Sequence, residues 1–328
     1  MKTVRFHRTG GPDVLVYETV PDPAPGPGEV LIRVEAAGMN FSDVLRRRGD
    51  NYPVASPLPF TPGSEVAGTV AALGPGVKGI ELGSLVYAAP RGGGYAQYVV
   101  APAAAVIPIP SGIDAAQATT LVIQGLTASF ALREAGRLSA GESVLVEAAA
   151  GGVGSFAVQL AKLSGAGLVI GAAGSETKRT KALALGADHA VDYTAPGWIQ
   201  EVRALTDGRG VDIVLEMTGG DMVGQALDTL ADFGRMVVYG QASGETALVD
   251  PQRLTVPNQS LAGFYIGAYL KRPELVRQTL AEIVDHVIAG RLTLEVGAVL
   301  PLSRAVEAHR LLEGRQSTGK LVLAPWED

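Results

Sequence analysis

The stretch SVLVEAAAGGVGSFAVQLAKLSG, residues 143–165, decides the fold. It opens with an apolar run over 143–149, the length of a buried strand, and ends with a helix pattern over 153–165 that Gly165 closes. A glycine-rich loop joins the two. A strand, a glycine-rich loop and a helix in this order form the first unit of a dinucleotide-binding sheet; the alternative is an ordinary tight turn of another α/β protein.

The segments that follow repeat this alternation of strand and helix. Helices are predicted over 175–187, 196–206 and 221–232. Further strands are predicted at 167–174, 189–193, 211–219, 234–240 and 261–266. Apolar strands separated by helices of this length predict a doubly wound parallel sheet with right-handed crossovers. This context favours cofactor binding at the loop over an ordinary turn.

The two ends of the chain differ from this middle part. Short strands between Gly/Pro turns, indicating a barrel or sandwich, are predicted at 29–38, 65–74, 83–90 and 94–102. A helix over 114–136 follows them. The tail is mixed, with helices over 273–289 and 303–313, the second with Ser303 as N-cap, and a strand over 320–325.

The glycine-rich loop supplies the predicted pyrophosphate site. Ala149 stands in place of the first glycine of the fingerprint, Gly151 is the second and Gly154 the third. The second glycine lets the backbone approach the pyrophosphate at the N-terminus of the helix, and the third lets the helix pack closely on the strand. The residues of the loop predicted to bind the cofactor are Ala150, Gly151, Gly152, Val153 and Gly154.

The end of the second strand predicts which cofactor is bound. An NAD site places an acid there, but residues 171–175 carry no carboxylate, and Lys178, Arg179 and Lys181 follow in the next helix. Basic residues oppose the dipole at the start of a helix, so a ligand phosphate is expected to neutralise them. Ser175 and Lys178 are therefore predicted to hold the 2′-phosphate of NADPH. A solvated basic helix face is the alternative, and Glu176 argues against NADPH.

Composition excludes several classes of function. The chain has 328 residues, enough for two domains, and a net charge of −6, which gives no electrostatic case for binding nucleic acid or an anionic membrane. With no cysteine, it has no disulfide, thiolate nucleophile or cysteine-ligated metal, and its four histidines are scattered. No signal sequence or apolar run of about 18–20 residues is seen, so a soluble cytoplasmic protein is expected.

The whole chain resembles the quinone oxidoreductase (zeta-crystallin-like) branch of the medium-chain dehydrogenase/reductase superfamily. The resemblance rests on AAGMNFSDVLRRRGDNYP (36–53), PFTPGSEVAGTV (59–70), GGYAQYVVAP (93–102), QGLTASFAL (124–132), AAAGGVGSFAVQLAK (148–162) and STGKLVL (317–323). It implies a GroES-like barrel domain made from residues 1–123 and 267–328, with a Rossmann NADPH-binding domain at 124–266 inserted between them.

The resemblance also implies a reaction without a metal. Where the zinc enzymes of the superfamily carry Gly-His-Glu, this chain has Gly63-Ser64-Glu65, and it has no cysteine ligand. A quinone or an α,β-unsaturated carbonyl compound accepts hydride without a Lewis acid, given alignment and a hydrogen-bond donor for the developing oxyanion. The expected protein is a metal-independent, NADPH-dependent oxidoreductase that acts on such a small molecule.

Further site residues follow from the resemblance. In a cleft between the domains it implies Asn40, Asp43 and Tyr52 as catalytic residues; Asn40 and Asp43 as caps of a helix starting near residue 42, and Tyr52 as barrel packing, are the structural alternatives. The other residues it implies contact the cofactor: Phe41, Thr127, Tyr193, Thr218, Gly240, Ser243, Phe264, Ile266 and Lys320.

Two other functions remain open. An enoyl-thioester reductase of the same superfamily needs a basic patch for the carrier phosphate, and Arg46 to Arg48, near Leu45 where the family often has a tyrosine, are the only candidates. The second alternative is a non-catalytic NADPH-binding protein, like the lens crystallins of the family. A homodimer is expected through the apolar 234–266 edge of the sheet.

Overall fold

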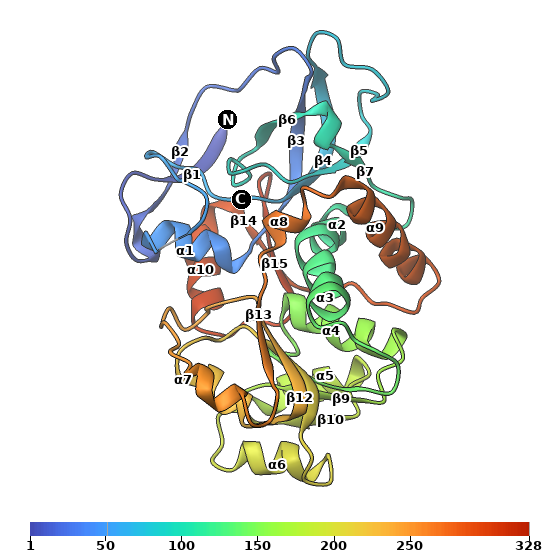
Figure 1. The fold of residues 1–328 in the computed structure, drawn as a ribbon. Coiled ribbons are helices and arrows are strands. Elements are labelled where there is room, and N and C mark those ends of the chain that lie inside the picture. Colours follow the sequence, from blue (N-terminus) through green and yellow to red (C-terminus); the bar gives the residue numbers. More distant parts are fainter. Residues whose placement is uncertain (51, 328) are drawn as a thin grey trace. The chain divides into compact units, whose positions relative to one another are not determined.

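The computed structural model describes residues 1–50 and 52–327. By its internal contacts the chain forms two compact units. Unit 1 consists of Met1–Thr120 and Glu295–Asp328, and unit 2 of Leu121–Leu294. In Figure 1, unit 1 carries the blue and red ends of the colour bar, whereas the green, yellow and orange middle of the chain forms unit 2.

Unit 2 contains the predicted parallel sheet. Six strands lie in the order β10-β9-β8-β11-β12-β13, all of them parallel to their neighbours. Their bounds are β8 Ser143–Glu147, β9 Leu168–Ala172, β10 His189–Val191, β11 Val211–Glu216, β12 Leu230–Val238 and β13 Ser260–Gly263. The chain runs outward from β8 to β10, then returns to the other side of β8 with β11. This reversal makes β8 and β11 the topological switch point, where doubly wound sheets bind their ligands.

Helices connect these strands as predicted. Those that follow β8 to β11 are α4 Gly152–Leu163, α5 Glu176–Ala184, α6 Trp198–Ala204 and α7 Asp221–Leu227, and α8 Ile266–Tyr269 follows β13. Strands buried on both sides, such as β8, form the core of the unit together with Trp198 of α6. One edge of this sheet is formed by β13, where Leu261 is exposed. The homodimer expected through this edge stays a prediction.

Unit 1 is a β-barrel-like sheet built from both ends of the chain. Its order is β14-β15-β3-β4-β5-β7, with β6 paired to β3, and β1 Lys2–Phe6 pairs separately with β2 Leu15–Thr19. The strands of the large sheet are β3 Glu29–Gly38, β4 Val66–Leu73, β5 Leu85–Ala88, β6 Tyr98–Pro102, β7 Ile107–Pro108, β14 Val296–Pro301 and β15 Lys320–Ala324. Because β15 pairs antiparallel with the end of β3, the tail completes the sheet begun by the first third of the chain.

The limits of the two units differ from the predicted domain boundaries in one long segment. Residues 267–294 were assigned to the returning tail, but they pack within unit 2, where α9 Pro273–Ile288 contacts α3 Leu126–Phe130. Arg133 fixes this arrangement with a two-pronged ion pair to Glu282 of α9, at 2.6 Å for each bond. The amphipathic pattern of α9 predicts a helix but cannot show which sheet the helix covers.

The helix predicted over 114–136 is present but not regular. It starts as α2 Ala115–Thr120, widens to π-helix at Leu121–Gly125 and again at Ala131–Ala135, and ends at Gly136. By length and composition alone, Ala115–Ala135 could cross a membrane, but 78% of its apolar window is buried in the protein, as in a core helix. The predicted N-cap Ser303 is wrong, because Ser303 lies in a short 3-10 turn and Arg304 precedes α10 Ala305–Glu313.

Candidate functional site

The glycine-rich loop of unit 2 has the geometry of a phosphate cradle. Gly151 is the N-cap of α4, with no side chain to cover the first amides of the helix, so these N–H groups face outward from the helix end. Ala148 makes the turn in the left-handed region (φ 48°), and Gly151 N–H donates to its carbonyl oxygen at 2.7 Å. A Cβ on Gly154 would stand 2.2 Å from the same oxygen. The third glycine is therefore required by the close approach of helix and loop.

Gln124 supports this loop and was missed by sequence reasoning. A Cβ on Gly152 would lie 2.0 Å from Gln124 Nε2, so the carboxamide packs directly against the start of α4. Its Oε1 is buried and has no hydrogen-bond partner among the described residues. Gln124 lies in the first π-helical segment, three residues before Thr127, and π-helix is often found at functional sites. Its place in QGLTASFAL was the only available signal.

The turn after β9 holds the residues predicted to select the cofactor. Ser175 is the N-cap of α5, and its Oγ accepts a hydrogen bond from Lys178 N–H at 3.4 Å. Its hydroxyl hydrogen can still donate. Arg179 is engaged elsewhere, because it donates to Asp192 at 2.7 Å and to the carbonyl of Ala173. Lys178 lies in the same first turn of α5, and its predicted contact with the 2′-phosphate stays a prediction.

Other predicted cofactor residues of unit 2 follow the carboxyl ends of its strands. Tyr193 follows β10, next to Gly174: a Cβ on Gly174 would lie 4.0 Å from its ring. Ser243 N–H donates to the carbonyl of Thr218 at 2.8 Å, which ties together the loops after β11 and β12. Gly240 approaches the backbone of Met217.

The segment after β13 is organised by aromatic stacking. The ring of Phe264 stacks on Tyr269 of α8 at 5.0 Å between centroids, and Tyr269 stacks on Phe130 of α3 at 5.1 Å. Ile266 is the first residue of α8 and is partly buried. Stacked rings of this kind hold a short segment in a fixed position.

Two glutamates at the switch point were also missed. Glu147 ends β8 and Glu216 ends β11, and both side chains are fully buried. Glu147 Oε2 accepts hydrogen bonds from the Thr218 hydroxyl at 2.8 Å and from Met217 N–H at 3.3 Å. Burial and the nearby charge of Glu216 raise the pKa of Glu147 to about 8, and burial also raises the pKa of Glu216. Sequence reasoning counted Glu147 only as a strand residue.

In unit 1, Asn40 lies at the start of α1 Phe41–Arg48 in a charged network. Its Nδ2 donates to Glu65 at 3.0 Å, and its Oδ1 accepts from the Lys320 ammonium at 2.9 Å. Lys320 also forms an ion pair with Glu65 at 2.5 Å, and the Tyr87 hydroxyl donates to the other oxygen of Glu65. A carboxylate only accepts hydrogen bonds and an ammonium only donates them. The Asn40 amide must therefore turn its N–H toward Glu65 and its oxygen toward Lys320.

Asp43 has the contacts of a structural residue, and its catalytic role stays a prediction. The side chain is fully buried and accepts hydrogen bonds from Asn40 N–H at 2.9 Å, Gly63 N–H at 3.2 Å and the Tyr95 hydroxyl at 3.2 Å. Burial raises its pKa above the ordinary value. The capping alternative is therefore the better description, because Asp43 closes the first turn of α1 and joins it to the barrel.

The hydrogen bonds that Lys320 donates lie within unit 1, and its role at the cofactor stays a prediction. Lys320 was expected on the cofactor, but its side chain is fully buried in unit 1 and its ammonium is occupied by Glu65 and Asn40. Gly38 makes room for it, since a Cβ there would stand 2.7 Å from Lys320 Cε. A buried lysine needs such a partner because an isolated charge away from water is costly.

The arginines of α1 form no exposed basic patch. Arg46 is buried, donates to Ser56 Oγ at 2.7 Å and to the carbonyl of Arg91 at 2.6 Å, and lies over the ring of Phe60. Arg47 and Arg48 both bind Glu313 of α10. These residues hold the unit together, so they offer no phosphate site for a thioester carrier.

Phe41 and Tyr52 are both partly buried. Phe41 is the first residue of α1, directly after Asn40. The ring of Tyr52 lies 5.6 Å from the guanidinium carbon of Arg46. This contact fits the packing alternative for Tyr52, although the side chain is still partly exposed.

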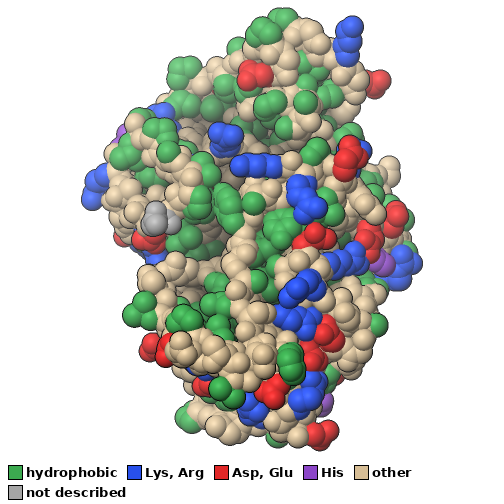
Figure 2. Space-filling view, in the orientation of Figure 1, with side chains coloured by type: hydrophobic (Ala, Val, Ile, Leu, Met, Phe, Trp, Pro, Cys, Tyr) green, Lys and Arg blue, Asp and Glu red, His purple; other side chains and the backbone are tan. Residues whose placement is uncertain are grey.

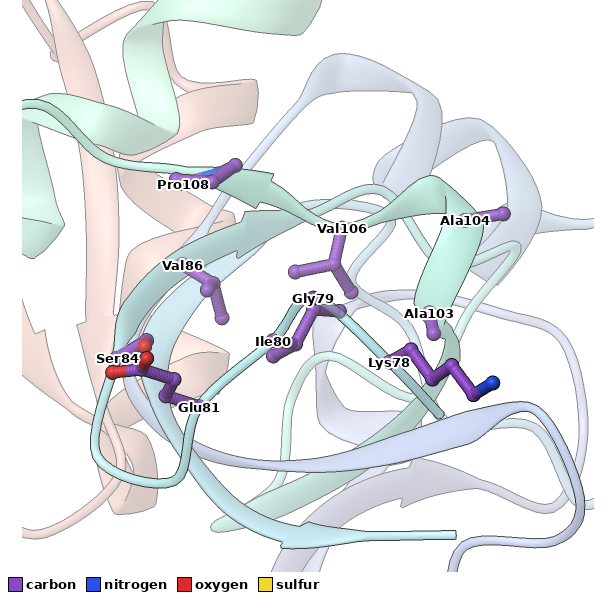
Figure 3. Close-up of a pocket in the computed structure, with 10 residues that line it drawn as sticks. All are labelled: Lys78, Gly79, Ile80, Glu81, Ser84, Val86, Ala103, Ala104, Val106 and Pro108. Carbon is purple, nitrogen blue, oxygen red and sulfur yellow. The ribbon is translucent and has the colours of Figure 1, made fainter. Parts of the chain in front are cut away.

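A pocket of about 720 Å³ lies elsewhere in unit 1. Its lining residues come from the β4–β5 connection, from β5 and from the segment after β6, and include Lys78, Ile80, Glu81 and Val106 (Figure 3). None of the residues predicted for the site lines it. Over the face shown in Figure 2, positive and negative side chains are interspersed, without one extended region of a single sign.

Two family models match the chain. A zinc-binding dehydrogenase model matches residues 152–285, and an alcohol dehydrogenase GroES-like domain model matches residues 26–111. A 2-haloacrylate reductase from a Burkholderia species is 36% identical over 98% of both chains, and a quinone oxidoreductase from Pseudomonas aeruginosa is 36% identical over 99% of both. This chain belongs to the quinone oxidoreductase family. It is thus an oxidoreductase of the medium-chain dehydrogenase/reductase superfamily, which confirms the resemblance.

Solved structures of quinone oxidoreductase relatives have the same fold. A mycobacterial protein complexed with NADPH is 37% identical, with a TM-score of 0.92 over 99% of this chain and 100% of that one. The Rossmann domain and the GroES-like domain predicted from sequence are thereby confirmed.

The zinc of the matched dehydrogenase model does not fit this member of the quinone oxidoreductase family. The chain has no cysteine, and residues 1–50 and 52–327 contain no group of three or more His, Asp or Glu side chains placed to hold a metal ion. The glutamate of Gly63-Ser64-Glu65 is instead bound to Lys320, Asn40 and Tyr87. This donor set binds a buried ammonium rather than zinc.

Proposed function

We propose that this protein is an NADPH-dependent, metal-independent reductase of quinones or α,β-unsaturated carbonyl compounds. The observation that carries the proposal is the loop after β8. The N-cap residue of α4 has no side chain to cover the first amides of the helix, and the helix lies so close to the loop that only glycine fits at residue 154. The mycobacterial relative solved with NADPH supports the cofactor. The names of the quinone oxidoreductase and 2-haloacrylate reductase relatives support an acceptor with a conjugated double bond.

When bound, NADPH supplies the hydride for reduction of such an acceptor. The residues of the chain bind and orient it: the amides of Gly152 to Gly154 receive the pyrophosphate, and Ser175 and Lys178 receive the 2′-phosphate. Thr218, Gly240 and Ser243 form the binding surface beyond β11 and β12. The rigid segment with Phe264 and Ile266 adds an apolar wall.

On the acceptor side, Asn40 is the proposed hydrogen-bond donor. Its amide has two N–H groups, of which Glu65 takes one, so the second can donate to the acceptor's oxygen. The Glu65–Lys320 ion pair holds the amide in this orientation. Donors fixed in advance of reaction are the ones that stabilise a developing oxyanion. Tyr52 is the second proposed acceptor contact.

Turnover tests the proposal against its alternatives. Purified protein is mixed with NADPH and a quinone, an enone, a 2-haloacrylate or an enoyl thioester, and loss of NADPH absorbance is followed. We expect turnover with at least one of the first three. Cofactor binding without turnover would support the non-catalytic alternative, and turnover with the thioester alone would support the enoyl-thioester reductase, which the engaged arginines of α1 disfavour.

Replacing Lys178 by alanine is expected to change the choice of cofactor. Loss of one charge-assisted contact to the 2′-phosphate costs about 1.5–3 kcal/mol, so NADPH affinity should fall roughly ten- to 150-fold. NADH has no 2′-phosphate and should be little affected. Fluorescence titration with both cofactors measures this, and Ser175→Ala should act in the same direction more weakly.

Salt provides a second readout for Lys178. An exposed phosphate contact is screened, so the preference of the unmodified protein for NADPH should shrink as ionic strength rises. If Lys178→Ala weakens both cofactors alike, the start of α5 is only a solvated basic face.

Removal of metal is expected to have no effect. Treatment with a chelator should leave the rate of NADPH oxidation unchanged, because the ligands that zinc requires are missing around Ser64. Elemental analysis of the purified protein checks this directly. About one zinc per chain, with activity lost on its removal, would contradict the metal-independent reaction.

A further inference from the structure

Glu147 and Glu216 form a buried pair at the carboxyl ends of the neighbouring strands β8 and β11. Glu147 and Glu216 are one residue beyond Val146 and Leu215, which pair directly across β8 and β11. Neighbouring strands lie about 4.8 Å apart, so Glu147 and Glu216 are neighbours across the sheet, and the charge of Glu216 acts on the carboxyl group of Glu147. Because β8 and β11 form the topological switch point, the pair lies at the edge of the sheet where dinucleotides bind.

Each glutamate of this pair uses one carboxylate oxygen in hydrogen bonds to the described residues, and its other oxygen has no such partner. Glu147 uses Oε2, for Met217 and Thr218, and Glu216 uses Oε1, for the N–H groups of Thr218 at 2.8 Å and Gly219 at 2.6 Å. Glu147 Oε1 and Glu216 Oε2 are buried and have no partner among the described residues. A single proton between these two oxygens would satisfy both.

No cation compensates the pair. Neither glutamate forms an ion pair within the part of the chain that the structure describes, and both side chains are fully inaccessible to water. Tyr239, which follows β12, is the titratable group that interacts with both glutamates. Its phenol is neutral at ordinary pH, and burial together with the two carboxylates raises its pKa further. Two unpaired buried anions at this distance are unfavourable, so one must keep its proton.

The pair also carries the loops that form the binding edge. The turn Met217–Gly219 is held by both glutamates, and the loop after β12 is joined to it by Ala242 N–H, which donates to Met217 O at 3.0 Å, and by the bond from Ser243 to Thr218. Three of the residues assigned to the cofactor, Thr218, Gly240 and Ser243, lie on these two loops. The charge of the pair therefore acts where an anionic cofactor would bind.

We propose that Glu147 and Glu216 are positioning residues that share one proton, which holds the Met217–Gly219 turn in its binding conformation and limits the negative charge beneath the cofactor. Loss of this proton places a second anion at the switch point and weakens binding of the cofactor's pyrophosphate. The inference rests on the proposed function for its effect on NADPH, but the shared proton itself exists without any cofactor.

Infrared difference spectroscopy of the cofactor-free protein tests the shared proton. At neutral pH we expect the C=O stretch of a buried protonated carboxylic acid, which disappears as the pH rises through about 8. The band should be absent from Glu147→Gln and from Glu216→Gln, because the amide then donates to the remaining carboxylate. Glu142→Gln, at the amino end of β8, should keep it. A neutral-pH spectrum of the unmodified protein without this band would overturn the proposal, even if NADPH binds.

Cofactor titration across pH tests the consequence. If only the protonated pair supports binding, NADPH affinity should fall about tenfold for each pH unit above the titration of the pair. Glu147→Gln should show a flat profile, because the variant has no shared proton to lose over this pH range. Glu142→Gln should keep the slope. An unchanged slope in Glu147→Gln would overturn the proposal, with Glu216→Gln as the second variant if the first does not fold. Absence of NADPH binding at every pH would instead refute the proposed function, leaving the infrared result to decide on the pair.

Discussion

Replacing Lys320 by alanine is expected to lower the free energy of unfolding by about 3–5 kcal/mol, the usual cost of breaking a buried ion pair from one side. The change leaves Glu65 fully buried without the Lys320 ammonium and removes the hydrogen bond from Lys320 to Asn40 Oδ1. It also leaves a cavity beside Gly38. Equilibrium unfolding in urea measures the loss.

Two variants separate the charge from the packing. Lys320→Met together with Glu65→Gln removes both charges and keeps most of the volume, so it should recover most of the lost stability. Lys162→Ala breaks an ion pair with Asp188 that is about one-third exposed, and should cost no more than about 1 kcal/mol. A Lys320→Ala protein that is as stable as the unmodified one but binds NADPH poorly would support the cofactor role that the sequence suggested for Lys320.

The ion pair of Lys320 with Glu65 could not be predicted from the sequence. STGKLVL is one of the six segments that carry the family resemblance, and it predicts the last strand, but a lysine in a strand pattern carries no sign of its partner. Glu65 is 255 positions away, and two antiparallel pairings, of β15 with β3 and of β3 with β4, bring the two together. The same holds for Arg47 and Glu313, which lie on helices from opposite ends of the chain.

Local signals were sufficient where a single segment determines the structure. The doubly wound sheet follows from apolar runs, glycine punctuation and helix lengths, and the helix predicted over 175–187 is present as α5. Contacts between segments that are distant in the sequence were not predicted. The packing of α9 in unit 2 and the meeting of Glu147 with Glu216 depend on tertiary neighbours, which one sequence does not display.

Asn40 and Asp43 lie between these cases. Both were weighed as helix caps and as catalytic residues, since one residue type serves both purposes. The structure separates them by burial: Asp43 has three donors and no access to solvent, whereas Asn40 is only partly buried and keeps an N–H that Glu65 does not use. The sequence shows the spacing of a capping box, but the number of donors around each side chain depends on the fold.

Replacing Gly154 by alanine is expected to disrupt the cofactor site and destabilise unit 2. The new Cβ would stand 2.2 Å from Ala148 O and 2.8 Å from Ala149 Cα, both backbone atoms that cannot rotate away. Helix α4 must shift off the loop, at the upper end of overpacking penalties, about 3 kcal/mol or more. A shift of about 1 Å in the amides that bind the pyrophosphate costs roughly a hundredfold in activity. Thermal unfolding and NADPH titration measure the two losses.

Gly224→Ala is the matched control, because Gly224 lies inside α7 and a Cβ there meets only Arg253 Nη1 at 3.8 Å. Alanine removes backbone freedom from the unfolded chain and has the higher helix propensity, so this variant should gain about 0.5–1 kcal/mol and bind NADPH normally. Opposite signs for one substitution in two helices of the same unit would isolate the close approach at Gly154 as the cause. If Gly154→Ala is instead as stable as the unmodified protein and binds NADPH equally well, the loop after β8 is an ordinary turn and the cofactor site lies elsewhere.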